Sequence, residues 1–121
     1  MTKSIMTVDD SASIRQCVRM ALAKAGYDVV EANDGLDGYN KFQKSAVQML
    51  IADVNMPNMD GIELIRNIRA LPSGKFVPAI LLTTESSPLM KEKGRAAGAT
   101  GWLVKPFNSE QLLAIVKKVL G

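Results

Sequence analysis

The stretch MLIAD, residues 49–53, is an unbroken apolar run that ends in a carboxylate. An apolar run of this length is typical of a strand that is buried on both faces, as in a parallel sheet. Turn-forming residues follow between Asn55 and Asp60, which indicates that the strand ends at Asp53. The stretch therefore predicts a central parallel strand whose last residue lies at an edge of the sheet.

Before and after residues 49–53 in the sequence, short apolar runs alternate with segments whose apolar residues recur at helical spacing. The order of strand then helix occurs five times along the chain. This pattern predicts one α/β domain, a doubly wound parallel sheet of five strands with five helices and right-handed connections. The expected strands are 4–8, 27–32, 49–53, 79–83 and 101–104, and the expected helices are 14–25, 36–43, 62–71, 89–97 and 112–120, with Ser109 as the N-cap of the last.

The composition fits one compact domain and excludes several kinds of chemistry. The chain has 121 residues, 47% of them apolar, with no run long enough to span a membrane and no export signal at its start. We therefore expect a cytoplasmic protein that does not bind a membrane. Cys17 is the only cysteine and histidine is absent, which excludes an internal disulfide, a Cys/His zinc site and any catalytic pair that needs histidine.

The formal net charge of +3 does not indicate a nucleic-acid partner. The 15 Lys and Arg residues are scattered along the chain and are not interleaved with aromatic residues. Such a distribution is typical of solvated helix faces rather than of a basic groove with stacking platforms. We therefore expect no binding to nucleic acid.

Polar residues stand at the ends of four predicted strands. Asp9 and Asp10 follow the first strand, Asp53 ends the third, Thr83 ends the fourth and Lys105 follows the fifth. Alone, an Asp there is most often a turn former or helix cap, and a Thr is an ordinary strand residue. Together they place three carboxylates, a hydroxyl and an ammonium at the edge where open parallel sheets bind ligands.

Three carboxylates at one edge repel one another and need a cation. A cluster that offers only oxygen ligands, without Cys or His, suits Mg²⁺, which takes one or two direct carboxylates and keeps several waters. The ammonium of Lys105 would supply a second positive charge. The sequence therefore predicts a Mg²⁺ site built around Asp9, Asp10 and Asp53.

Five short motifs together resemble the signature of response-regulator receiver domains. They are Val8-Asp9-Asp10, Asp53-Val54-Asn55-Met56-Pro57, Met59-Asp60-Gly61, Leu82-Thr83 and Lys105-Pro106-Phe107. The resemblance covers the whole chain and is to the stand-alone, CheY-type chemotaxis receiver. It implies a receiver domain over residues 1–121 without an output domain, and a flavodoxin-like sheet in the strand order 2-1-3-4-5.

The resemblance also implies a function, that of a two-component signalling switch which accepts a phosphoryl group from a histidine kinase on Asp53. Such a switch is not an enzyme, apart from catalysing its own phosphorylation and dephosphorylation. The implied protein ligands of Mg²⁺ are Asp9, Asp10, Asp53 and the backbone carbonyl of Asn55. Thr83 would hydrogen-bond the phosphoryl group, Lys105 would neutralise its charge, and the Lys105–Pro106 peptide bond would be cis.

The implied output is a change of the face around Lys105 and Trp102, which would then bind a downstream protein. Receivers commonly carry Tyr or Phe where this chain has Trp102, so this ring is either the aromatic switch behind Thr83 or a plain surface anchor. We expect a monomer that acts in chemotaxis, with the flagellar motor switch as one candidate partner. An acidic helical peptide would suit the basic residues near this face, which are Lys91, Lys93, Arg95, Lys117 and Lys118.

Alternatives remain open at this stage. A receiver of this kind could instead be a phosphorelay intermediate, a phosphate sink, or a protein-interaction module that is never phosphorylated. A haloacid-dehalogenase-type hydrolase would need a second Asp where the chain has Asn55. A flavodoxin-like cofactor binder would need glycine amides where the chain has two acidic residues.

Asn55 and Glu85 flank the reactive positions, and in the family such neighbours set the lifetime of the phosphoryl group.

Overall fold

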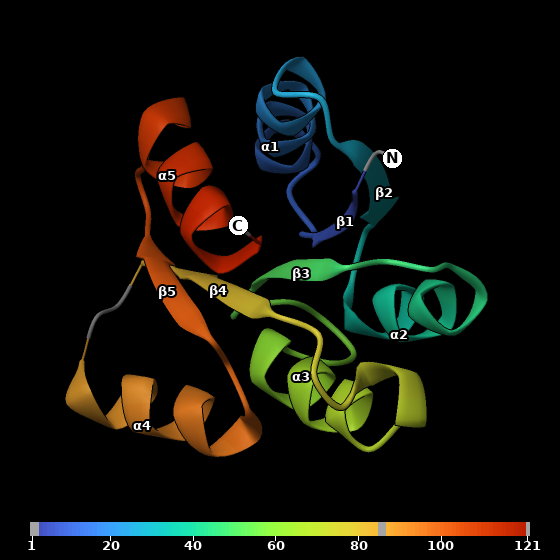
Figure 1. The fold of residues 1–121 in the computed structure, drawn as a ribbon. Coiled ribbons are helices and arrows are strands. Elements are labelled where there is room, and N and C mark those ends of the chain that lie inside the picture. The colour runs from blue at the N-terminus through green and yellow to red at the C-terminus, as the bar shows by residue number, and fades with distance from the viewer. Residues whose placement is uncertain (1–2, 85–86, 121) are drawn as a thin grey trace.

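The computed structural model describes residues 3–84 and 87–120, and in these residues a five-stranded parallel sheet lies between two layers of helices (Figure 1). The strands are β1 Ser4–Val8, β2 Asp28–Ala32, β3 Met49–Asp53, β4 Ala79–Thr83 and β5 Gly101–Val104. The helices are α1 Ala12–Lys24, α2 Gly35–Lys44, α3 Gly61–Arg69, α4 Pro88–Ala97 and α5 Ser109–Leu120, with a 3₁₀ turn at Pro72–Gly74.

The strand order is β2-β1-β3-β4-β5, and every neighbouring pair is parallel. Helices α1 and α5 cover one face of the sheet, and α2, α3 and α4 cover the other (Figure 1). The α/β fold class and the expected strand order are therefore confirmed. Within the described ranges, no helix is long and apolar enough to cross a membrane.

Strand β3 lies at the centre of the sheet, and all five of its residues are buried. Because successive side chains of a strand point to opposite faces, this one strand contributes to both halves of the core. Met49 and Ile51 pack in the cluster under α1 and α5. Leu50 and Ala52 pack in the cluster under α2, α3 and α4. The apolar run therefore has no solvent-facing side, which explains why it does not alternate with polar residues.

Side chains cap the N-termini of the helices, and in α1 and α5 the capping residue differs from the one expected from the sequence. In α1 the hydroxyl of Ser11, not an aspartate, accepts a hydrogen bond from the Ile14 amide at 3.4 Å. The prediction of Ser109 as the cap of α5 is wrong, because Ser109 is the first helical residue. Asn108 Oδ1 accepts from the Gln111 amide at 2.8 Å, and Gln111 Oε1 accepts from the Asn108 amide at 3.0 Å. This reciprocal pair satisfies two amides that a serine cap one residue later would leave open.

The loop after β3 returns against that strand through Gly61, the first residue of α3. The Gly61 amide donates to the carbonyl oxygen of Val54 at 3.0 Å. A Cβ atom at residue 61 would overlap the backbone carbonyl of Asp53. The absence of a side chain therefore lets α3 begin directly beside the end of β3.

We expect Gly61→Ala to lower the free energy of unfolding by about 2 kcal/mol, because backbone atoms cannot rotate away from the added methyl group. Gly38→Ala is the control, since the three atoms nearest its methyl group would be side-chain atoms of Val8 and Leu64, at 3.0 to 3.4 Å. That control also gains up to about 1 kcal/mol of helix propensity. Urea unfolding followed by circular dichroism measures both variants. Equal losses of stability would contradict the assigned close approach at Gly61.

Candidate functional site

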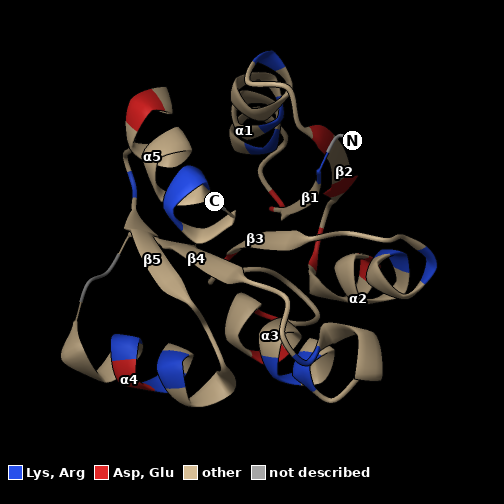
Figure 2. Cartoon of the chain, viewed as in Figure 1, with Lys and Arg blue, Asp and Glu red and all other residues tan. Residues whose placement is uncertain are grey.

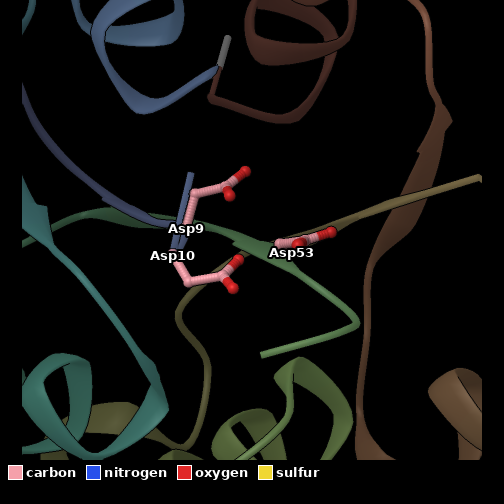
Figure 3. Close-up of side chains that lie close together, drawn as sticks. All are labelled: Asp9, Asp10 and Asp53. Carbon is pink, nitrogen blue, oxygen red and sulfur yellow. The ribbon is translucent and has the colours of Figure 1, made fainter. Parts of the chain in front are cut away.

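Three carboxylates meet at the carboxyl edge of the sheet, where β1 and β3 end side by side (Figure 3). Asp9 and Asp10 follow β1, and Asp53 is the last residue of β3. One oxygen atom from each carboxylate lies within 4.8 Å of the oxygens from the other two. Asp9 and Asp53 are buried, at 1% and 7% exposure, whereas Asp10 is exposed. The cluster therefore has a buried wall and one side that is open to water.

Lys105 supplies a positive charge to this cluster from the end of β5. Its Nζ atom donates to Asp53 Oδ1 at 3.0 Å and to Asp9 Oδ2 at 3.5 Å. The Lys105 amide donates to the Thr83 carbonyl at 2.8 Å, and the Lys105–Pro106 peptide bond is cis. One ammonium thus faces three carboxylates, which leaves the site short of positive charge when all three are ionised.

Burial raises the pKa of Asp53 above its ordinary value, and the negative charges of Asp9 and Asp10 act in the same direction. The hydrogen bond and the charge of Lys105 act in the opposite direction but do not cancel the effect of burial. The ionised Asp53 carboxylate is therefore less favourable in the folded protein than in the unfolded chain. A further cation at this edge would relieve that penalty.

Thr83 is buried at the end of β4, one register position beyond Leu82, the partner of Asp53 in β3. Asn55 is exposed and lies two residues after Asp53, where it lines a hollow of about 430 Å³ between α3 and α4. The structure therefore brings the predicted residues of β1, β3, β4 and β5 to one edge. Glu85 lies outside the described residues.

Trp102 lies in β5 with its ring between that strand and α4. A Cβ atom at residue 94 would overlap the ring, so Gly94 of α4 provides the space in which the ring packs. The ring also contacts the core under α3 and α4, which includes Leu81. The position of α4 and the position of this ring therefore depend on each other.

The exposed surfaces of α4, β5 and α5 carry both basic and apolar side chains. Leu89 and Val104 are exposed, at 63% and 42%. Lys and Arg residues recur along α4, together with the acidic Glu92 (Figure 2). The exposed basic residues of α4 and α5 are Lys91, Lys93, Arg95, Lys117 and Lys118.

Sequence reasoning missed one residue of the site, Arg15. Its Nη1 atom donates to the backbone carbonyl of Asp9 at 2.6 Å. The only signal in the sequence is its position, one helical turn after the N-cap Ser11 and therefore close to the end of β1. That spacing does not reveal whether the guanidinium turns toward the site or toward solvent.

With this geometry established, known proteins provide a comparison. The family model for the Response regulator receiver domain matches residues 5–117. The chain is 35% identical over 119 residues to the chemotaxis protein CheY1 of Helicobacter pylori, covering 97% of this chain and 96% of that protein. It is 34% identical over 116 residues to the transcriptional regulatory protein TrcR of Mycobacterium tuberculosis, covering 96% of this chain but only 44% of that protein.

Solved structures agree with the sequence relatives. The chemotaxis protein CheY4 of Vibrio cholerae has a TM-score of 0.96 and 48% identity, with 98% of this chain and 99% of that chain covered. The receiver domain of the sensor histidine kinase PA1611 of Pseudomonas aeruginosa has a TM-score of 0.92 and 27% identity, with 100% and 99% covered. That receiver has a magnesium ion coordinated in its active site cleft. By fold, by sequence and by the acidic edge of its sheet, the chain belongs to the response regulator receiver domain family.

Proposed function

We propose that this chain is a phosphorylation-dependent switch that accepts a phosphoryl group on Asp53 from a histidine kinase and then binds a downstream protein. The observation that carries the proposal is the placement of Asp53. It is a nearly buried carboxylate at the carboxyl edge of the sheet, 3.0 Å from the Lys105 ammonium and beside two further carboxylates. Receiver domains are signalling domains that take phosphoryl groups from histidine kinases, so residues 1–121 would act as one such domain.

The residues at this edge fit a hard divalent cation. Asp9, Asp10 and Asp53 offer oxygen ligands close enough to share one ion, and the exposed Asp10 leaves room for the waters that Mg²⁺ keeps. We propose these three side chains and the backbone carbonyl of Asn55 as the protein ligands. The similar PA1611 receiver, with its magnesium ion in the active site cleft, supports the choice of metal. Bound Mg²⁺ would supply charge neutralisation for the phosphoryl oxygens.

The chain's own residues account for the rest of the transfer. An Asp53 carboxylate oxygen forms the new P–O bond as the P–N bond to the donor histidine breaks, and the imidazole nitrogen keeps the electron pair of that bond. Charge in such a transition state spreads over the peripheral phosphoryl oxygens, so catalysis consists of positioning and neutralisation. The Lys105 ammonium would move from the carboxylates to these phosphoryl oxygens and neutralise their charge. The Thr83 hydroxyl would donate a hydrogen bond to one phosphoryl oxygen.

The proposed output runs from Thr83 through Trp102 to the surface of α4. A hydrogen bond from Thr83 to the phosphoryl group would change the space behind this residue, and the ring of Trp102 would repack against Gly94. The affected surface is basic and partly apolar, which suits an acidic helical segment of a partner protein. The similarity to CheY1 and CheY4 favours a partner in chemotaxis, with the flagellar motor switch as one candidate and a monomer as the acting form.

A second candidate function is that of a phosphorelay intermediate or phosphate sink. It uses the same Asp53 chemistry but needs no change in the α4 surface. The behaviour of Trp102 on phosphorylation therefore separates the two functions.

Intact-mass analysis after incubation with phosphoramidate should show one added phosphoryl group per chain when Mg²⁺ is present, and little without it. Like charges among the carboxylates and the donor would otherwise oppose the reaction. Asp53→Asn should abolish the labelling. Asp60→Asn is the matched control, since Asp60 is an exposed acidic residue of the same loop that caps α3. Labelling that is independent of Mg²⁺, or that persists in Asp53→Asn, would exclude the proposed chemistry.

In the absence of metal, Asp53→Asn should raise the melting temperature at pH 7 by roughly 3 °C, because the ionised carboxylate is disfavoured in the folded state. The sign follows from the raised pKa of Asp53. The penalty is complete above the folded-state pKa, and it vanishes below the ordinary value of 3.8, where both states are protonated. The gain should therefore shrink as the pH falls toward 3.8.

Differential scanning calorimetry across this pH range measures the effect, with Asp28→Asn as an exposed control on β2. Millimolar Mg²⁺ should stabilise the wild type more than Asp53→Asn and so reduce the difference. A lower melting temperature for Asp53→Asn at pH 7 would show that the Lys105 ion pair outweighs the effect of burial.

The fluorescence of Trp102, the only tryptophan, should change when beryllofluoride, a phosphoryl mimic, is added to the Mg²⁺-bound protein. The change should shrink in Thr83→Ala, which lacks the hydroxyl that couples the phosphoryl group to the ring. The spectrum with Mg²⁺ alone is the baseline, because the metal itself can quench. An identical response in Thr83→Ala would rule out this coupling, and no response in the wild type would favour the relay or sink.

A further inference from the structure

The peptide unit that joins Asp9 to Asp10 is held by Arg15. The Nη1 atom of Arg15 donates to the carbonyl oxygen of Asp9 at 2.6 Å. This carbonyl belongs to the peptide plane from which Asp10 projects, so the hydrogen bond restrains the backbone rotation that aims the Asp10 side chain. Within residues 3–84 and 87–120, the Asp10 carboxylate has no hydrogen bond or ion pair of its own. Its direction therefore depends on the backbone of the turn.

The other contacts of this turn act on Asp9 and not on the link to Asp10. The Asp9 amide donates to the carbonyl of Ala32 at 3.1 Å. The Ser11 amide donates to Asp9 Oδ1 at 2.9 Å, and Lys105 Nζ lies 3.5 Å from Asp9 Oδ2. Asp9 is thus fixed from three sides, whereas the bond from Arg15 acts on the peptide plane between the two aspartates.

Arg15 is itself held in place by Glu31 of β2. Arg15 Nε lies 3.4 Å from Glu31 Oε1, and Arg19 Nε lies 3.3 Å from Glu31 Oε2. The Arg15 side chain is 19% exposed and that of Arg19 is 42% exposed. Ion pairs with this degree of exposure contribute little to fold stability. The two arginines share one carboxylate, but the contact with the acidic turn comes from Arg15.

We propose that Arg15 is a positioning residue for the divalent cation, which orients Asp10 and thereby sets the affinity of the acidic cluster for Mg²⁺. The inference rests on the metal site of the proposed function. Simple electrostatics makes the opposite prediction. The positive charge of Arg15 repels a cation, so its removal by itself would tighten metal binding. Positioning requires that removal of Arg15 weakens it.

The test uses Mn²⁺ as the probe, with the free ion measured by electron paramagnetic resonance and Mg²⁺ measured by competition. Arg15→Met and Arg15→Gln should each raise the Kd about tenfold, the size of effect typical for residues that orient metal ligands. Arg19→Met and Arg19→Gln are matched controls, because they remove the same charge beside the same Glu31 without touching the turn. Their Kd should stay within about twofold of the wild type. Either Arg15 variant suffices if the other does not fold.

A kinetic measurement separates positioning from general damage. In the phosphoramidate reaction, the Mg²⁺ concentration that gives half the maximal rate should rise about tenfold in Arg15→Met, in step with the Kd. The rate at saturating Mg²⁺ should stay within about twofold of the wild type, because Arg15 does not touch the reacting atoms. A loss of rate that saturating metal does not restore would overturn the assignment.

Asp10→Asn distinguishes failure of this inference from failure of the proposed function. If the wild type binds no Mn²⁺, or if Asp10→Asn binds it as tightly as the wild type, the proposed metal site itself is wrong. If Asp10→Asn loses the ion while the Arg15 variants bind it as tightly as the wild type or more tightly, the metal site stands and the positioning role is wrong.

Discussion

The organisation of this protein depends on one constraint, the burial of β3 on both faces while its last residue is a carboxylate. All five residues of the strand are buried, and Asp53 leaves the core only at the edge of the sheet. A nearly buried carboxylate is stable only with compensating charge or hydrogen bonds. The end of β5, two strands away, supplies Lys105, and the end of the adjacent β1 supplies two further carboxylates. The same edge is therefore electrostatically unfavourable without a further cation, and it is also the site of the proposed phosphorylation.

The balance of charge at this edge explains why the binding of a metal and the binding of a phosphoryl group would depend on each other. Lys105 alone does not cancel the effect of burial on the pKa of Asp53. An added cation would therefore stabilise the ionised carboxylate in the metal-free site. In the proposed function, bound metal would lower the negative charge of this edge and so allow an anionic donor to approach. In the proposed metal site, the geometry of the turn after β1 would set the affinity for the ion, because the exposed Asp10 follows a backbone that Arg15 contacts. The same few residues at this edge would thus set both the charge of the proposed site and the orientation of its ligands.

The proposed link from the site to the surface depends on packing. Trp102 fills the space that Gly94 leaves in α4, so the ring and the helix cannot move independently. A glycine in a helix interior lowers helix stability by about 1 kcal/mol relative to alanine, but at residue 94 the methyl group of alanine would overlap the Trp102 ring. A change behind Thr83 would therefore be felt on α4, where the basic side chains lie.

By itself, the amino-acid sequence determined the five strand and helix pairs and the polar residues at the strand ends, because apolar periodicity and turn chemistry are local properties. It also indicated an oxygen-only cation site, since the types of ligand are visible without coordinates. Only the tertiary structure decided that Arg15 turns toward Asp9 and that Trp102 packs on Gly94. It also decided that Asn108 rather than Ser109 caps α5. Each of these depends on the direction of a side chain or on the approach of two distant segments, and neither follows from spacing along one chain.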